Sequence, residues 1–263
     1  MSAHAPGPVR EALPCRRGRF LARRFGLASV LSLPFHGDSG EDRWAAADSA
    51  WALCDGASEG YDGAGWAAAL ARALVLHADP SAAARAARRQ YRAGFGVYAV
   101  QPNPETGAAP YPTSGWLAEA SAARGSFSTA LAVRASRSGG FVRAYARGDT
   151  ALFVRDGLET LAAFPLERAD DFGLAPDLVS AGGDGTEDFL VATIPVGGTR
   201  RPVLCLATDA LAARILRAAA GERRELWDFL DRADAAQLDA WARAEIAAGT
   251  LREDDLTLLA VRP

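Results

Sequence analysis

Three aspartates of this sequence lie at the ends of short apolar runs, where carboxylates can support chemistry. Asp55 follows the run WALC, Asp209 follows VLCLAT, and Asp254 comes shortly before LTLLAV. Apolar runs of this length are typical of buried strands. A carboxylate at the end of a buried strand is held rigidly and can meet others from distant parts of the chain. Hard cations such as Mg²⁺ or Mn²⁺ prefer oxygen ligands and keep several waters, so a few carboxylates are enough to bind them.

Three further acids occupy similar positions: Asp149 lies in RGDTALFV between two strand-like segments, and Glu41 and Asp42 follow the first predicted strand. Two divalent ions can activate a water and neutralise a phosphoryl group. We therefore predict a carboxylate metal centre. Each motif alone also fits a plainer interpretation, since Asp55 before Gly56 could be only a turn and the acids near the last strand could be solvated loop residues.

The predicted elements explain how these acids could be held. Gly139-Gly140 and Asp156-Gly157 separate strand-like segments and indicate hairpin turns, while Ser81 suits a helix N-cap and Gly249 a helix end. The order of elements predicts an α+β fold built mostly on antiparallel sheet. The predicted strands are 25–33, 51–54, 129–135, 141–146, 151–155, 159–163, 189–195, 203–207 and 256–261. The predicted helices are 64–77, 81–92, 116–124, 211–220, 222–232 and 235–248, with a loop over 94–113.

Length and composition limit the organisation of the chain. It has 263 residues, of which 49% are hydrophobic, which is enough for a sizeable core. Because no linker-like stretch divides it, we expect a flexible segment over 1–24 and a single domain over 25–263. The net charge of -3 disfavours nucleic-acid and membrane-surface partners. No apolar run is long enough for a signal peptide or a membrane span, so we expect a cytoplasmic protein.

Residue usage excludes several kinds of catalysis. All 29 basic residues are arginine, which excludes a P-loop lysine, a Schiff-base lysine and a Ser–Lys dyad. With only three histidines, a Ser–His–Asp triad is disfavoured. The cysteines have no zinc-binding spacing, and Cys54 and Cys205 lie in apolar runs as small buried hydrophobes do.

Taken in order, the acidic motifs resemble those of a known family, the metal-dependent protein phosphatases of type 2C (PPM), and indicate a divergent bacterial member. The resemblance covers roughly residues 25 to 262. The motifs are Glu41-Asp42, Asp55-Gly56, Gly148-Asp149-Thr150, Thr208-Asp209-Ala210 and Asp254-Asp255-Leu256-Thr257.

This resemblance implies a central antiparallel β-sandwich flanked by helices, an αββα arrangement, with two Mg²⁺ or Mn²⁺ ions at one edge. It implies that Asp55 bridges both ions, that the Gly56 carbonyl binds one, and that Asp209 and Asp254 bind the other. Glu41 or Asp42 would hold a metal-bound water, and Asp149 would shape a third, weaker metal site. The implied reaction proceeds through a metal-activated water, without a covalent phosphoenzyme.

The sequence departs from the family pattern near the expected substrate site. Ala57 stands where some eukaryotic members have a histidine, and Ala210 replaces a usual glycine. The arginine that often binds phosphate before Glu41 is absent, and His36 and Gly37 occupy its neighbourhood. The sequence therefore leaves open which residue contacts the phosphoryl group.

Three functions are compatible with these observations. The first is a protein serine/threonine phosphatase that acts on a phosphorylated protein and counteracts a Ser/Thr kinase. The second keeps the chemistry but uses a small phosphorylated metabolite, with segments 94–113 and 165–187 closing a smaller pocket. The third is a non-catalytic phosphopeptide-binding regulatory module.

Overall fold

The computed structural model describes residues 25–35, 40–58, 61–98, 125–173 and 176–263. The predictions of a flexible segment over 1–24 and of a helix over 116–124 lie outside these residues, as does His36. In the described part of the chain, no helix is long and apolar enough to span a membrane.

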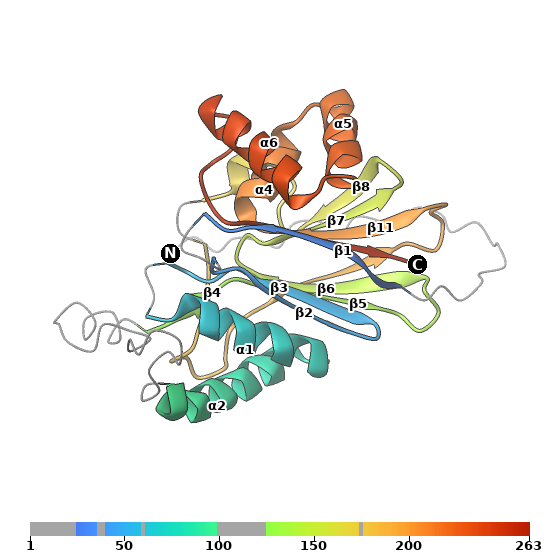
Figure 1. Ribbon diagram of the computed structural model, residues 1–263. Helices are drawn as coiled ribbons and strands as arrows, with labels where there is room; N and C mark the ends of the chain where they lie inside the picture. The colour runs from blue at the N-terminus through green and yellow to red at the C-terminus, as the bar shows by residue number, and fades with distance from the viewer. Residues whose placement is uncertain (1–24, 36–39, 59–60, 99–124, 174–175) are drawn as a thin grey trace, which may run out of the picture.

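Two five-stranded sheets face each other, and every strand pairing within them is antiparallel (Figure 1). The first sheet contains, in spatial order, β1 (Gly26–Leu33), β12 (Leu256–Arg262), β11 (Pro202–Ala207), β7 (Ala151–Asp156) and β8 (Glu159–Phe164). The second contains β10 (Leu190–Pro195), β6 (Phe141–Arg147), β5 (Ala130–Ala135), β3 (Ala50–Cys54) and β2 (Arg43–Ala47). A separate two-stranded sheet pairs β4 (Phe127–Ser128) with β9 (Val179–Ser180).

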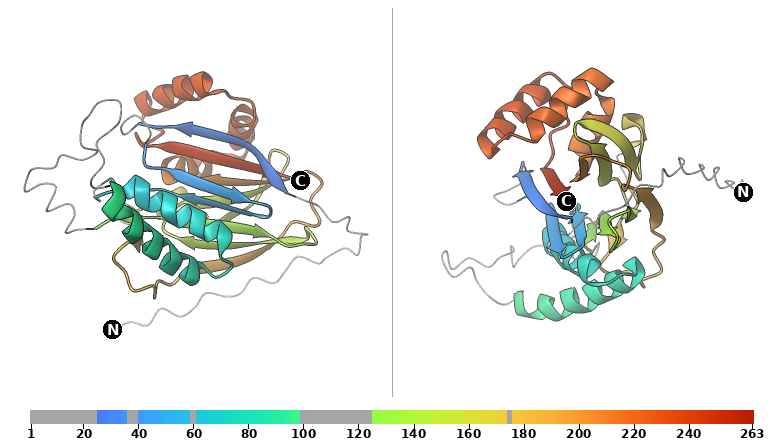
Figure 2. Two further views of the ribbon diagram at one scale, coloured as in Figure 1. Left: turned by 60° about the horizontal axis from the view of Figure 1, so that its bottom comes forward. Right: turned by 90° about the vertical axis from the view of Figure 1, so that its right-hand side faces the viewer.

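The helices cover both outer faces of this sandwich, as Figure 2 shows from two further directions. On the second sheet lie α1 (Gly63–Leu76) and α2 (Pro80–Tyr98). On the first sheet lie α4 (Asp209–Arg217), α5 (Ala220–Leu230) and α6 (Ala235–Ala247), and a 3-10 helix spans Ala169–Asp171. Three aspartates cap these helices. Asp62 accepts from the Gly65 N–H at 2.9 Å, Asp79 accepts from the Ala82 N–H at 3.1 Å, and Asp234 forms a capping box with Gln237.

The central strands are apolar on both faces because each face is covered. Successive residues of a strand point to opposite faces. In β7, Leu152 and Val154 therefore point between the sheets, whereas Ala151 and Phe153 point towards α4, α5 and α6. This double coverage explains the continuous apolar runs in β3, β7, β11 and β12, and it confirms the predicted α+β sandwich flanked by helices.

Three predictions about elements are corrected by the structure. Ser81 lies inside α2, which begins at Pro80, and Asp79 takes the N-cap position that the sequence suggested for Ser81. Helix α2 continues to Tyr98, so residues 94–98 are helical and not the start of a loop. Gly94 and Gly96 favour a loop, but glycine propensity is a weak signal for where a helix ends. Strand β2 was not predicted, because its sequence RWAAA has little apolar alternation and it forms a sheet edge.

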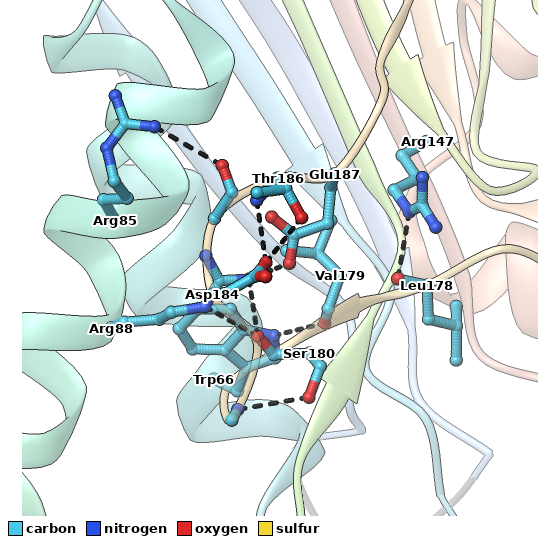
Figure 3. Close-up of polar contacts among 12 residues, drawn as sticks. Trp66, Arg85, Arg88, Arg147, Leu178, Val179, Ser180, Asp184, Thr186 and Glu187 are labelled. Atoms are coloured by element: carbon cyan, nitrogen blue, oxygen red, sulfur yellow. Dashed lines mark hydrogen bonds and ion pairs between the residues drawn. The ribbon is translucent and has the colours of Figure 1, made fainter.

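Polar contacts fix the segment 178–188 against helix α2 and strand β6 (Figure 3). The guanidinium of Arg88, which is buried, donates to the Ser180 carbonyl at 2.8 and 2.9 Å and pairs with Glu187. The Trp66 indole donates to the Val179 carbonyl at 2.8 Å, and Arg147 donates to the Leu178 carbonyl at 3.0 Å. These contacts hold β9 beside β4, the strand that supports the turn after Asp55.

Candidate metal centre

In the first sheet, the strand register places three predicted ligands at one end. Ala151 at the start of β7 is opposite Ala207 at the end of β11. Ala207 is also opposite Leu258, near the start of β12. The acids just outside these strand ends are Asp149, Asp209 and Asp254.

The second sheet brings two more acids to the same place. Arg43 at the start of β2 pairs with Cys54 at the end of β3, so the adjoining Asp42 and Asp55 lie at one end of this pair. Asp55 is the electrostatic centre of the group, since burial first, and then the negative charges of the other four aspartates, raise its pKa well above the ordinary value. Five acids from separate segments, Asp42, Asp55, Asp149, Asp209 and Asp254, therefore interact at one end of the sandwich.

The backbone of Asp55 is held by hydroxyl groups that the sequence analysis did not single out. Thr129 accepts from the Asp55 N–H at 3.0 Å, and its own N–H donates to the Asp55 carbonyl at 2.9 Å. The Ser128 hydroxyl donates to that carbonyl at 2.8 Å. Thr129 and Thr150 share a hydrogen bond of 2.6 Å between their hydroxyls. This chain of contacts connects Asp55 to the Asp149-Thr150 turn across the two sheets.

Gly56 occupies a position with no space for a side chain. A Cβ atom there would lie 2.6 Å from the carbonyl carbon of Gly63 and 2.7 Å from its oxygen. Gly56 also forms an isolated β-bridge with Ser128. The start of α1 therefore packs directly on the turn after Asp55, which explains the Asp-Gly sequence by close backbone approach.

Asp209 and Asp254 share a cationic partner, Arg252. One nitrogen of its guanidinium donates to Asp209 and, at 2.8 Å, to Asp254. The Arg252 side chain is 44% exposed, whereas Asp209 is 11% exposed. Sequence reasoning missed this residue, although a signal existed in its opposite charge two positions before Asp254.

The neighbouring Asp255 has a different role. Its two carboxylate oxygens accept from the Phe35 N–H and the Glu41 N–H, each at 2.6 Å. The Thr208 hydroxyl donates to the Asp255 carbonyl at 3.3 Å and accepts from the Thr257 N–H at 3.0 Å. Asp255 thus fixes the backbone that leads into Asp42, and it does so as a structural acid.

The Glu41 side chain contacts the turn that follows Asp55. Its carboxylate accepts a hydrogen bond from the Ser58 hydroxyl, on the turn that follows Asp55 and Gly56. Near the surface, this contact joins the Glu41-Asp42 motif to the segment that follows the Asp55-Gly56 motif. Whether Glu41 or Asp42 holds a metal-bound water stays a prediction.

Asp42 and Asp149 are buried, and none of their four carboxylate oxygens has a hydrogen-bond partner of good geometry. Burial raises the pKa of each to about 7. Nearby negative charge adds to the rise, from Asp255 for Asp42 and from Asp209 for Asp149, while the hydroxyl of Thr257 opposes it for Asp42. Burying carboxylates without partners is costly, and a bound cation would offset this cost.

The donor set fits a hard divalent cation in its chemistry, because all of its side chains are carboxylates and several oxygens lack partners. Among the residues that the structure describes, however, no three acidic, histidine or cysteine side chains meet at metal-ligand spacing. Arg252 lies between two of the predicted ligands, Asp209 and Asp254. The structure therefore brings the acids to one edge without assembling a finished ligand set.

The buried acids make a prediction about stability. Because the pKa of Asp42 rises from 3.8 to about 7 on folding, the folded state binds its proton more tightly than the unfolded state. The contribution of Asp42 to the free energy of unfolding is then fully present below about pH 4 and is lost as the pH rises through 7. An asparagine at this position carries no charge to bury, so in EDTA Asp42→Asn should raise Tm at pH 7.5 by several degrees. The size of the effect follows because each unit of pKa shift is worth about 1.4 kcal/mol.

Calorimetry from pH 5 to pH 8 measures this effect, with Asp170→Asn, an exposed acid on the 3-10 helix, as the matched control. The control should leave the pH dependence of Tm unchanged. A lower Tm for Asp42→Asn than for the wild type at pH 7.5 would show that the Asp42 charge stabilises the metal-free fold.

When the chain is compared with known proteins, significant matches are found among solved structures but not among protein families or curated sequences. No protein-family model matches the sequence, and no curated protein gives a significant match. PppA, a key regulatory component of T6SS in Pseudomonas aeruginosa, is 17% identical with a TM-score of 0.54 over 92% of this chain and 98% of its own.

Two structures of PstP match to a similar degree. The catalytic domain of the serine threonine protein phosphatase PstP, in complex with 2 manganese ions, is 14% identical with a TM-score of 0.54, over 91% of this chain and 98% of that domain. The Mycobacterium tuberculosis serine/threonine phosphatase PstP/Ppp is 15% identical with a TM-score of 0.55, over 91% and 99% of the two chains. Over about nine-tenths of its length, this chain has the fold of the serine/threonine protein phosphatases that PstP represents.

Proposed function

We propose that this chain is a metal-dependent phosphomonoester hydrolase of the type 2C family that removes phosphate from phosphoserine or phosphothreonine in proteins. One observation carries the proposal: five aspartates from separate segments interact at one end of a fold shared with PstP. On this proposal the enzyme counteracts a Ser/Thr kinase in the cytoplasm, where its buried, unpaired Cys54 and Cys205 stay reduced.

The proposed roles follow the positions of the acids. Asp55 and the Gly56 carbonyl would hold Mg²⁺ or Mn²⁺ together with Asp209 and Asp254, and Asp149 would serve a third ion. When bound, these ions activate a water and neutralise the phosphoryl charge. Asp42 and Glu41 would accept hydrogen bonds from water beside the ligands. The hydrogen bond that the Asp55 N–H donates to Thr129 and the one that its carbonyl accepts from Ser128 keep the backbone of Asp55 fixed while charge is redistributed during the reaction.

Arg252 is proposed to contact the substrate phosphate in place of the arginine that the sequence lacks. Its guanidinium is attached to the ligand cluster and remains half-exposed, so it can reach a group bound at the cluster's outer side. A guanidinium presents a planar fork of donors that matches phosphate oxygens. Arg252 is thus our candidate for the phosphate contact that the departures near residue 36 left open.

At saturating Mn²⁺, we expect Arg252→Ala to raise KM for para-nitrophenyl phosphate about tenfold, equivalent to about 1.4 kcal/mol of lost binding, because its charge no longer attracts the dianion. Arg252→Lys should recover part of the loss. Arg243→Ala, which removes an exposed arginine paired with Asp239 on α6, is the control. Steady-state kinetics measure this effect. An unchanged KM for Arg252→Ala would show that Arg252 does not contact the substrate phosphate.

The function itself is tested by dephosphorylation of a phosphoserine peptide with and without metal. Hydrolysis should require added Mn²⁺ or Mg²⁺ and stop in EDTA, while zinc should substitute poorly because the cluster lacks Cys and His ligands. Parallel assays with small phosphorylated metabolites separate a protein phosphatase from a metabolite phosphatase. Absence of turnover even with para-nitrophenyl phosphate would favour the non-catalytic binding module.

A further inference from the structure

A second charged site lies at the opposite end of the sandwich from the aspartates. It is a cleft of about 800 Å³ between helix α5 and the first sheet. Its walls come from the turn between β7 and β8, the link before β11, helix α5 and the end of β12. The arginines that line it are Arg200, Arg201, Arg224, Arg232 and Arg262.

The strands establish the separation of the two sites. Strand β7 starts beside Asp149 and ends at Asp156 in the cleft, and β11 runs the other way, from Pro202 in the cleft towards Asp209. Six residues of strand span roughly 20 Å. A ligand of the cleft therefore lies too far from the five aspartates to share their ligands.

The three aspartates that line the cleft are already engaged. Asp156 accepts the backbone N–H groups of Arg200 at 3.0 Å and Arg201 at 2.7 Å, which lowers its pKa. Asp231 pairs with Arg262 at 3.0 Å and with the buried Arg155 at 2.8 Å. The third carboxylate, Asp228, pairs with Arg232.

Three guanidinium groups in the lining are less neutralised, although Asp156 attracts two of them, those of Arg200 and Arg201, at longer range. Within the described ranges, the side chains of Arg200, Arg201 and Arg224 form no ion pair and no hydrogen bond. Asp156 holds the backbone of the first two in place, and the Gly157 N–H donates to the Arg201 carbonyl at 2.8 Å. The cleft therefore has an excess of positive charge presented from a fixed turn and from a helix.

Buried contacts support one wall of the cleft from behind, where Arg155 pairs with the lining residue Asp231. The guanidinium of Arg155 lies 4.3 Å from the centre of the Trp227 ring, and its side chain is fully buried. The Trp227 indole donates to the Thr160 hydroxyl at 2.9 Å. A wall supported in this way reduces the entropy lost when a ligand binds.

We propose that this cleft binds a small molecule with at least two phosphate groups, such as a diphosphate ester. Arginine forks suit phosphate oxygens, and two phosphates match unpaired cations that come from two separate elements. Leu158, Pro202 and Val203 supply an apolar wall for the rest of the molecule. The volume is in the usual range for small-molecule sites, which favours such a ligand over a protein segment.

Calorimetric titration of the full chain with pyrophosphate in EDTA tests this site without metal. We expect binding at least tenfold tighter than that of inorganic phosphate. The double variant Arg200→Ala/Arg224→Ala should weaken pyrophosphate binding at least tenfold. Arg72→Ala removes an equally exposed arginine on α1 and should have no effect. Asp209→Asn should bind pyrophosphate as the wild type does, because the proposed site does not depend on hydrolase activity.

Three results would overturn the proposal. The first is pyrophosphate binding no tighter than phosphate. The second is an equal loss of affinity in Arg72→Ala, which would indicate diffuse attraction to the whole surface. The third is a phosphopeptide that binds more tightly than pyrophosphate and depends on Arg200 and Arg224, which would make the cleft a protein-docking site.

Discussion

Asp55→Asn and Asp209→Asn are each expected to lower kcat/KM for phosphopeptide hydrolysis by at least about a hundredfold, or about 2.7 kcal/mol of transition-state stabilisation. Both substitutions keep the shape of the side chain and remove the charge that holds a divalent cation. Asp55 is the acid whose pKa is raised by all four of the others, so its loss should affect the whole cluster.

The loss should not come from unfolding. Replacing the buried, repelled carboxylate of Asp55 by an amide relieves repulsion in the metal-free protein, so Tm in EDTA should stay equal or rise. For Asp209→Asn, the lost ion pair with Arg252 opposes the relief of burial, so Tm in EDTA should change little. Asp239→Asn, on the surface of α6, is a matched control that should keep full activity. Near-wild-type turnover by either variant would assign catalysis to other carboxylates.

Gly56→Ala should be the most destabilising single-methyl addition at the site. Its Cβ would meet the Gly63 backbone at 2.6 and 2.7 Å, well inside contact distance, and backbone atoms cannot turn aside as a flexible side chain can. We expect a cost of about 3 kcal/mol or more, equivalent to a fall in Tm of roughly 6–12 °C. Activity should fall as well, because the turn that carries Asp55 must shift.

Gly221→Ala in the first turn of α5 is the control for this substitution. A Cβ there meets nothing within 4 Å, and alanine favours the helix. Its Tm should be unchanged or slightly higher. If Gly56→Ala were as stable as Gly221→Ala, the result would show that α1 does not pack directly on the turn after Asp55.

The parts of the fold that sequence reasoning predicted well are those with strong local signals. Strands β3, β11 and β12 are continuous apolar runs because they are covered on both faces, and acids lie just after β3 and β11 and just before β12. The hairpin turns at Gly139 and Gly157 have positive φ, as glycine permits. These local features also explain why the order of five acidic motifs indicated the fold when solved relatives share only 14–17% identity.

Other features depend on contacts that no local pattern reports. Strand β2 is recognisable only by its pairing with β3, and helix α2 extends past the two glycines that favoured a loop. The pairing of Arg252 with Asp209 joins residues 43 positions apart. The hydroxyls of Thr129 and Thr150 matter only because two sheets bring them together. Such roles become visible once the tertiary structure is known.

The most direct test of the central claim is an anomalous-difference map from a crystal soaked in Mn²⁺. The account predicts two strong peaks that both contact Asp55, with Asp209 and Asp254 contacting one of them and the Arg252 side chain moved away from that position. Peaks elsewhere, or no peak within coordination distance of Asp55 at saturating Mn²⁺, would contradict the proposed metal centre and the hydrolase function built on it.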